Sequence, residues 1–229
     1  MDMDTVTATR ERSRDWIHMR RAFDLMTALM LLLLSFPFLI VVALAVRLQD
    51  GGPVLFRQER IGRHGQPFQL WKFRSMRTGG LGTAITAGGD KRVTPLGRLL
   101  RRYKLDELPQ LWNVLRGDMS LIGPRPEVPC FVDAADPVWK AVHSVRPGIT
   151  DLATLVYRDE ERILAAFPDP ERGYREAILP VKLALNLQYL KQRSAVRDLK
   201  LLAMTIRYSL VPSGFDPDRI KEALLAERR

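Results

Sequence analysis

The sequence predicts a mostly helical α+β protein that is attached to a membrane. An apolar run near the N-terminus is long enough to cross a bilayer. Short apolar runs over residues 53–76 predict a small β-hairpin, and apolar residues recur at helical spacing in later segments. We therefore expect a basic N-terminal segment (1–24), a membrane helix (25–46) and a cytosolic helical domain (47–229), with amphipathic helices at the membrane interface.

The charge balance is basic, because 36 Lys and Arg residues outnumber 26 Asp and Glu residues and give a net charge of +10. Such a balance suits nucleic acid, an anionic bilayer surface or a phosphorylated substrate. Cys130 is the only cysteine, so no internal disulfide can form, and the soluble part is expected in a reducing cytosol. The histidines are too scattered in the sequence to predict a metal cluster: His18, His64 and His143.

The apolar run Leu25–Val46 would measure roughly 33 Å as a straight helix, enough to cross a hydrocarbon core of about 30 Å. Arginines flank it on both sides, so the positive-inside rule favours the cytoplasm for both ends. Pro37 removes a backbone hydrogen bond and allows a bend, and Ser35 can supply a hydroxyl bond to a freed carbonyl. The run is expected either as a proline-broken re-entrant helix or as a kinked spanning helix.

Three local features are expected before the central motif. The predicted hairpin turns at residues 63–66 and carries Lys72 on its second strand. Residues 78–90 are rich in Gly and Thr, which indicates a mobile loop, but no GK[ST] follows the glycines as in a Walker loop. Residues 94–103 predict a short amphipathic helix that places Arg101 beside the acidic residues that follow.

The most informative stretch is 104–126, KLDELPQLWNVLRGDMSLIGPRP, which contains two adjacent carboxylates. Asp106 is a good N-cap residue, Pro109 suits a first turn and Gly117 a stop, so a helix is expected to start at Asp106. Asp106 and Glu107 then lie at the positive end of the helix dipole, where carboxylates stay ionised and a phosphate can dock. Their side chains diverge, so one can attack phosphorus while the other holds a metal or takes a proton. Alternatively, Asp106 only caps the helix and Glu107 is solvated.

Two arginines follow in proline-containing turns. Arg125 lies between Pro124 and Pro126, which stiffen the backbone. Its planar guanidinium can therefore grip a phosphate with two parallel hydrogen bonds. Arg146 precedes Pro147 and Gly148 in a second turn of the same kind.

Helices are also predicted over 180–190 and 194–210. The second carries an apolar side that suits core packing or a bilayer interface: Val196, Leu199, Leu202, Ala203, Ile206 and Leu210. A final short helix is expected to begin at Asp216, with Pro217 in its first position. Residues 157–161 form an acidic patch whose simplest interpretation is a solvated helix start.

With these pieces in place, the chain resembles the small monotopic phosphoglycosyl transferases, the bacterial sugar transferase family that starts polysaccharide and glycoprotein assembly on polyprenyl phosphate. The resemblance runs from Arg20 to Tyr208. Its most specific part is RVTPLGRLLRRYKLDELPQLWNVLRGDMSLIGPRP, residues 92–126. Supporting parts are RRAFD before the membrane run, Pro37 within it, WKFRSM, VRPGIT and the DLK triplet at 198–200.

The resemblance implies transfer of sugar 1-phosphate from a nucleoside diphosphate sugar, usually a UDP-sugar, to undecaprenyl phosphate with release of UMP. It also implies Mg²⁺ dependence, a covalent phosphosugar intermediate and a monotopic position on the cytoplasmic face of the bacterial inner membrane. Asp106 matches the family's nucleophile and Glu107 its partner, a metal ligand or base, so that both carboxylates are expected near the metal. Pro37 matches the proline of the family's re-entrant helix. Four cations match residues near the family's active site: Lys72, Arg101, Arg125 and Arg146.

Two positions depart from the family pattern. In relatives the serine of the membrane break directly precedes the proline, whereas here Phe36 lies between Ser35 and Pro37. Many relatives carry an aspartate where Asn186 stands, so a metal or donor contact from this position would need a substitute from the acidic residues 159–161.

Two other function classes explain less of the sequence. A membrane-anchored binder of nucleic acid or anionic lipid fits the charge of +10 but gives no role to Asp106, Glu107 or Arg125, so we expect no nucleic-acid partner. A metal-dependent glycosyl transferase would need a DxD motif, and the only such triplets, 2–4 and 216–218, lie in the expected tails. The sequence names neither the sugar nor the pathway nor the oligomeric state.

Overall fold

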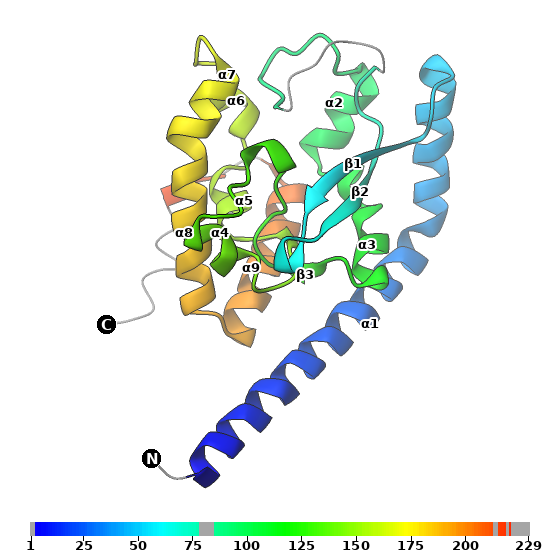
Figure 1. The fold of residues 1–229 in the computed structure, drawn as a ribbon. Helices are drawn as coiled ribbons and strands as arrows, with labels where there is room; N and C mark the ends of the chain where they lie inside the picture. The colour runs from blue at the N-terminus through cyan, green and yellow to red at the C-terminus, as the bar shows by residue number, and fades with distance from the viewer. Residues whose placement is uncertain (1–2, 78–84, 213–214, 219, 221–229) are drawn as a thin grey trace.

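The computed structural model describes residues 3–77, 85–212, 215–218 and 220, with side chains from His18 onward. A long N-terminal helix, α1 (Met3–Asp50), extends away from the body at its start and runs alongside it at its end (Figure 1). The body consists of short helices and two small sheets. The mostly helical fold with a small hairpin is therefore confirmed, while residues 78–84 of the predicted loop lie outside the described residues.

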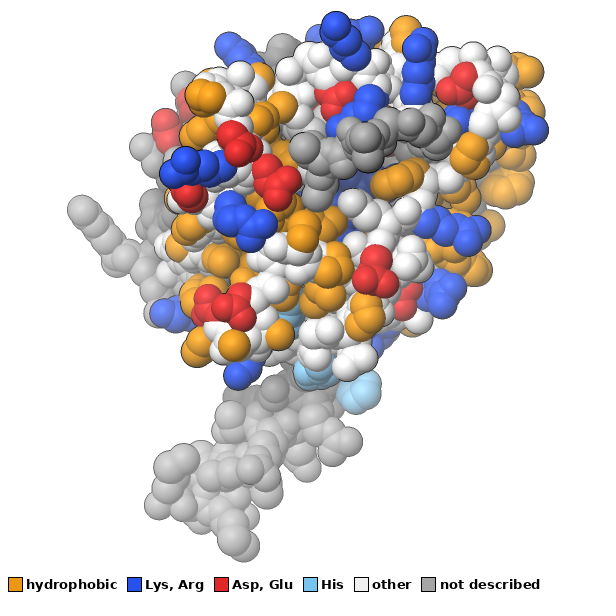
Figure 2. Space-filling model, turned by 45° about the horizontal axis from the view of Figure 1, so that its top comes forward, with side chains coloured by type: hydrophobic (Ala, Val, Ile, Leu, Met, Phe, Trp, Pro, Cys, Tyr) orange, Lys and Arg blue, Asp and Glu red, His pale blue; other side chains and the backbone are white. Residues whose placement is uncertain are grey.

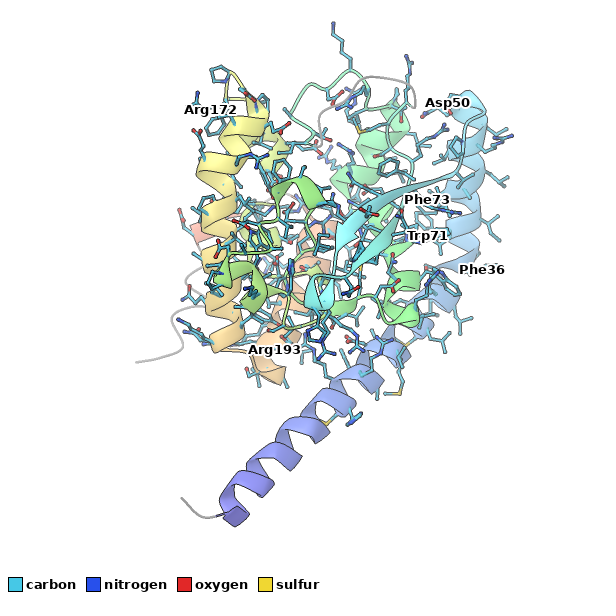
Figure 3. The ribbon with its side chains drawn as sticks, viewed as in Figure 1. Phe36, Asp50, Trp71, Phe73, Arg172 and Arg193 are labelled. Atoms are coloured by element: carbon cyan, nitrogen blue, oxygen red, sulfur yellow. The ribbon has the colours of Figure 1, made fainter. Side chains whose placement is uncertain are left out.

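Pro37 does not interrupt α1. The helix continues on both sides of it and changes direction close to Phe36 (Figure 3). Because proline lacks an N–H, the carbonyl that loses its helical partner is that of Leu33. Ser35 Oγ instead donates to the carbonyl of Leu31 at 2.6 Å. The predicted break is thus corrected to a bend within one helix, and the predicted compensation by Ser35 reaches a different carbonyl.

The apolar part of α1 is largely exposed. Among the described residues one helical segment, His18–Asp50, is long and apolar enough to cross a membrane, with a mean hydropathy of 2.9 in its most apolar window. Only 11% of that window is buried against the body. Leu33, Leu34 and Leu48 are exposed, whereas Val46 packs into the protein. An exposed apolar surface of this length indicates a helix that contacts lipid.

The predicted hairpin is confirmed, including its turn. Strand β1 (Leu55–Ile61) pairs antiparallel with β2 (Pro67–Phe73), from Leu55 opposite Phe73 to Ile61 opposite Pro67. A short 3₁₀ turn, Arg63–Gly65, connects them, and His64 adopts a left-handed φ of 59° there. The hairpin packs against the end of α1 and against α2 (Pro95–Arg102) through a shared apolar cluster that includes Val42, Val46, Phe73 and Leu100.

The acidic pair does not start an α-helix as predicted. Lys104 adopts a left-handed φ of 56° after α2, and Leu105–Glu107 form a separate 3₁₀ turn. The α-helix α3 (Gln110–Arg116) begins after Pro109 and ends at Gly117, whose φ is 95°. The prediction of Asp106 as the helix N-cap is therefore wrong, because the carboxylates belong to a 3₁₀ turn that ends before α3 begins, and Pro109 is the residue that precedes α3. The prediction of a stop at Gly117 is confirmed.

A parallel strand pair joins the two proline turns, which the sequence did not predict. Strand β3 (Ser120–Ile122) pairs with β4 (Gly148–Thr150), so that Ser120 lies opposite Gly148. A Cβ atom on Gly148 would lie 2.1 Å from the backbone nitrogen of Gly123, which explains why glycine is needed there. The connection between the strands contains α4 (Pro137–Val142) and a 3₁₀ turn, Pro129–Phe131.

The C-terminal half is helical, and its two longest predicted helices are confirmed. They are α8 (Leu179–Lys191) and α9 (Ala195–Leu210), the latter capped by Ser194. Before them come α5 (Leu152–Val156), α6 (Glu160–Leu164), α7 (Pro170–Gly173) and a π-helical turn, Tyr174–Ile178. Asp216 Oδ1 accepts from the Asp218 backbone as the predicted cap, but most of the final predicted helix lies outside the described residues.

Helix α9 divides its apolar residues between two environments. Leu201 and Tyr208 are buried in the main core. A second set is between 50% and 68% exposed and follows one side of the helix: Val196, Leu199, Ile206 and Leu210. Core packing therefore accounts for only part of the apolar surface of α9.

Candidate active site

Glu107 lies at the centre of a buried ionic cluster. Its carboxylate accepts two hydrogen bonds from Arg125, Nη1 to Oε2 at 3.0 Å and Nη2 to Oε1 at 2.5 Å. Lys72 Nζ, from strand β2, donates to Oε1 at 3.3 Å. The 3₁₀ turn before α3, the hairpin and the loop after β3 thus bring three of the predicted site residues together.

The orientation of Arg125 depends on the β3–β4 pair as well as on its prolines. Its Nη1 also donates to the carbonyl of Ile149 at 3.1 Å. Its backbone N–H donates to Asp151 Oδ2 at 3.0 Å, and Asp151 Oδ1 caps helix α5 through the backbone of Thr154. Asp151 was not among the residues predicted from the sequence, although an aspartate before a short apolar helix is a recognisable N-cap signal.

Asp106 is buried, with 5% of its surface exposed, and no described atom hydrogen-bonds to its Oδ1. A buried polar atom without a partner is costly unless a ligand or ion satisfies it. Burial raises the pKa of Asp106, and the negative charge of Glu107 adds to this effect, while Lys72, Lys104 and Arg101 oppose it. The sequence-based expectation that this carboxylate is simply ionised at a helix end therefore needs correction.

The pKa values of the two neighbouring carboxyl groups are shifted in opposite directions. Burial also acts to raise the pKa of Glu107, but Arg125, Lys72 and Lys104 outweigh it and hold that pKa well below its usual range. Glu107 is therefore ionised, whereas Asp106 holds its proton more strongly than a free aspartate. Burial lowers the pKa of Lys72 to about 8, against the opposing charge of Glu107.

A divalent cation fits Asp106 better than Glu107. Both oxygens of Glu107 are already engaged by Arg125 and Lys72, whereas Asp106 Oδ1 is free to accept a ligand. In the described part of the chain, no group of three or more His, Cys, Asp or Glu residues is placed to hold a metal. Mg²⁺ is commonly bound by one or two carboxylates together with substrate phosphates, which this donor set allows.

Two further predicted arginines have other partners. Arg101 lies near enough to Asp106 to affect its pKa, but it pairs with Glu161 Oε1 at 2.6 Å and donates to Ser75 Oγ at 2.9 Å. Arg146 Nε donates to the carbonyl of Gly117, at the end of α3, at 2.9 Å. The structure therefore brings Arg101 to the edge of the cluster and does not bring Arg146 to it.

The acidic residues considered as substitutes near Asn186 are also engaged. Glu160 pairs with Lys182, Glu161 with Arg101 and Asp159 with Arg158. Asn186 itself is buried, with 5% of its surface exposed, and no described atom hydrogen-bonds to its Oδ1. None of these contacts places a substitute carboxylate beside Asp106.

The basic segment before the membrane run meets the DLK triplet in space. Arg20 Nη1 forms an ion pair with Asp198 Oδ2 at 2.8 Å. Asp24 accepts from Ser120 Oγ at 2.7 Å and from the backbone of Leu121 at 3.1 Å. These contacts fasten α1 to β3, the strand that leads directly to Arg125.

Comparisons with known proteins find relatives over most of the chain. The sequence model described as bacterial sugar transferase matches residues 15–211. A relative from Caulobacter vibrioides, named UDP-glucose:undecaprenyl-phosphate glucose-1-phosphate transferase, is 41% identical over 197 residues, which cover 82% of this chain and 68% of the relative.

Two further relatives differ in length. An Aeromonas hydrophila protein, named UDP-N-acetylgalactosamine-undecaprenyl-phosphate N-acetylgalactosaminephosphotransferase, is 37% identical over 200 residues, which cover 85% of this chain but 44% of the relative. A Bacillus subtilis protein named as the uncharacterized sugar transferase EpsL is 36% identical, and the match covers 86% of this chain and 89% of that protein. The chain thus spans less than half of some relatives and nearly all of others.

Proposed function

Because this chain belongs to the bacterial sugar transferase family, we propose that it is a phosphoglycosyl transferase that moves sugar 1-phosphate from a UDP-sugar to undecaprenyl phosphate and releases UMP. The proposal depends mainly on one observation: Asp106 is a buried carboxylate with an oxygen that has no hydrogen-bond partner, and it lies beside Glu107, which is paired with Arg125 and Lys72. The names of the Caulobacter and Aeromonas relatives support the donor and acceptor classes.

The first step is attack by an Asp106 carboxylate oxygen on the phosphorus that carries the sugar. The new oxygen–phosphorus bond forms as the bond to the bridging oxygen of the diphosphate breaks, and UMP leaves with that oxygen. In the second step an oxygen of undecaprenyl phosphate attacks the same phosphorus, which releases the Asp106 carboxylate and gives undecaprenyl diphosphate sugar. A covalent carboxylate nucleophile divides one difficult transfer into two easier ones.

The cations of the cluster suit the charge that develops in both steps. Arg125 presents a planar guanidinium and Lys72 an ammonium to Glu107, and Lys72 lies near enough to Asp106 to affect its pKa, so both can stabilise a transferring phosphoryl group. We propose that Asp106 would hold Mg²⁺ together with the donor diphosphate, while Glu107 stays paired with Arg125 and Lys72, and the bound ion would neutralise phosphate charge. The attraction of a cation would also favour the ionised form of Asp106.

We propose that the protein lies on the cytoplasmic face of the bacterial inner membrane. The exposed apolar surface of α1 supports contact with lipid, and the bend near Pro37 is compatible with a helix that returns to the side it entered. The exposed apolar side of α9 is accompanied by the exposed cations Lys200 and Arg207, which suits an anionic bilayer interface. A soluble donor and a lipid acceptor then meet at one surface.

The rival class, a binder of nucleic acid, is supported less well. On the face shown in Figure 2, Lys and Arg side chains are interspersed with acidic and apolar side chains instead of forming one stripe. Lys72, Arg101 and Arg125 are directed at carboxylates within the protein. The relatives do not identify the sugar that is transferred, because one is named for glucose and another for N-acetylgalactosamine.

The test is UMP release by the purified full chain in detergent, with Mg²⁺ and a panel of UDP-sugars, with and without undecaprenyl phosphate. Without acceptor, release should stop at about one UMP per chain, because the covalent step cannot turn over. Asp106→Asn should abolish release, whereas Asp133→Asn, at an exposed aspartate, should leave it intact. Multiple turnovers without acceptor, or an active Asp106→Asn variant, would contradict the proposal.

A further inference from the structure

A second buried ionic cluster lies beside the candidate site and has no part in the proposed chemistry. Lys182 Nζ, on α8, donates to Glu160 Oε2 at 2.8 Å and to the Tyr174 hydroxyl at 3.1 Å, and it lies 3.6 Å from Glu127 Oε1. The Tyr174 hydroxyl donates in turn to Glu127 Oε1. We call these four residues the Lys182 cluster.

Together with Arg60, the Lys182 cluster is balanced in charge, and most of it is buried. The side chains of Lys182 and Glu127 are 8% and 9% exposed. Arg60 Nη1 lies 3.8 Å from Glu127 Oε2, so two cations accompany Glu127 and Glu160. Burial acts to lower the pKa of Lys182, but Glu127 and Glu160 outweigh it and raise that pKa, so the ammonium stays charged. Removal of one member would leave a buried charge without its partner.

On one side, the Lys182 cluster fastens the segment that carries Arg125. Three interactions hold consecutive backbone groups of this segment: Arg125 N to Asp151 Oδ2 at 3.0 Å, Arg60 Nη1 to Pro126 O at 3.0 Å, and Ile61 N to Glu127 O at 2.9 Å. The Glu127 side chain adds a fourth, because it joins the end of the segment to α8 through Lys182. The position of Arg125 therefore depends on α8 as well as on the hairpin.

On its other side, the Lys182 cluster fastens the start of α6. Glu160 is the first residue of that helix, and its neighbour Glu161 pairs with Arg101 Nη1 at 2.6 Å. Lys182 holds Glu160 directly. One lysine therefore connects the segment that carries Arg125 with the helix start that orients Arg101.

We propose that Lys182, held between Glu127 and Glu160, is a positioning residue that sets the separation of Arg125 and Arg101 and thereby the fit of the donor diphosphate. This proposal rests on the proposed function, because it assigns the two arginines to the donor. Lys182 contacts neither arginine and acts only through the two carboxylates. Its effect should therefore appear in donor binding.

The first test is Lys182→Met, which keeps the length of the side chain and removes the ammonium. We expect kcat/KM for the UDP-sugar to fall by roughly 10- to 100-fold, mainly through a higher donor KM, as a small misplacement of site residues would cause. Lys191→Met is the matched control, because it makes the same change at an exposed position of the same helix. A folded Lys182→Met variant with the donor KM of the original protein would overturn the proposal.

The second test separates positioning from stability. The double variant Lys182→Met with Glu160→Gln removes one charge of each sign, and Glu127 keeps Arg60 as its cation, so the thermal midpoint should recover. The connection to α8 is still absent, so the donor KM should stay raised. If the donor KM returns to its original value together with the thermal midpoint, Lys182 has only a structural role. The double variant also carries the test if Lys182→Met alone does not fold.

Hydrogen exchange gives a readout that does not depend on the reaction. In Lys182→Met, or in the double variant, the backbone amides of Arg125 and Ile61 should exchange faster, because both hold the segment that Lys182 fastens. Unchanged exchange would overturn the connection itself. Absence of UMP release by the unsubstituted chain with every UDP-sugar would instead refute the proposed function, so the two failures are distinguishable.

Discussion

Replacement of Arg125 by lysine isolates the geometry of its guanidinium from its charge. Arg125 gives Glu107 two hydrogen bonds and the carbonyl of Ile149 a third. A lysine ammonium keeps the charge and one contact with Glu107, so it loses a charge-assisted hydrogen bond worth about 1.5–3 kcal/mol. If that orientation is required in the transition state, kcat/KM should fall by roughly 10- to 150-fold.

The assay is the initial rate of UMP release as a function of UDP-sugar concentration. Arg172→Lys is the control, because it makes the same change on α7 in an exposed pair with Glu176 (Figure 3). The thermal midpoint of each variant is measured in parallel, so that loss of folding is not read as loss of activity. A folded Arg125→Lys protein with kcat/KM within about twofold of the original would refute the reasoning that a planar, two-point contact is needed.

Three further changes test separate parts of the account. Burial lowers the pKa of Lys72 to about 8, so its ammonium is lost as pH rises through that value and activity should fall; Lys72→Arg should move this limb of the pH–rate profile to higher pH. Pro37→Leu should straighten α1 and give mixed topology with lower activity, and labelling of cysteine reporters from each side of the membrane measures the topology. In the unsubstituted protein, labelling of both ends of the membrane helix only from the cytoplasm supports re-entry. Labelling of its N-terminus from the outside contradicts re-entry. Arg146→Gln should lower the free energy of unfolding by about 1 kcal/mol without changing the donor KM, because the Arg146 side chain hydrogen-bonds to the backbone at the end of α3. A raised donor KM would indicate instead that Arg146 takes part in donor binding.

Local patterns predicted the parts of the fold that depend on neighbouring residues. The hairpin followed from its apolar runs and turn residues, and α8 and α9 from helical periodicity. Gly117 ended α3 as expected, because its φ of 95° suits glycine. These features are set within a few residues of the chain, so a single sequence contains them.

Other features depend on contacts between distant segments. The predicted start of α3 was too early because Leu105–Glu107 form a separate 3₁₀ turn, which the local sequence does not distinguish from the first turn of an α-helix. Strands β3 and β4 have three residues each, too short to show a period, and their pairing joins residues far apart in the chain. The same reason applies to Arg146, whose partner is at the end of α3, and to the Lys182 cluster.

The candidate site was predictable in its residue types and only partly in its arrangement. Lys72, Glu107 and Arg125 do come together, as the family resemblance implied. The opposite pKa shifts of Asp106 and Glu107 could not be read from their positions, because they arise from burial and from cations on three other elements. That difference matters for function, since it leaves one carboxylate paired and the other with a free oxygen.

The central claim is that Asp106 accepts the phosphosugar covalently, and the most direct measurement is mass spectrometry of the chain after brief incubation with Mg²⁺ and the preferred UDP-sugar in the absence of undecaprenyl phosphate. The account predicts a mass increase of one sugar phosphate, mapped to the peptide that contains Asp106, and its disappearance when acceptor is added. Asp106→Asn should show no adduct. An adduct on another residue, or acceptor-dependent UMP release by Asp106→Asn, would contradict the account.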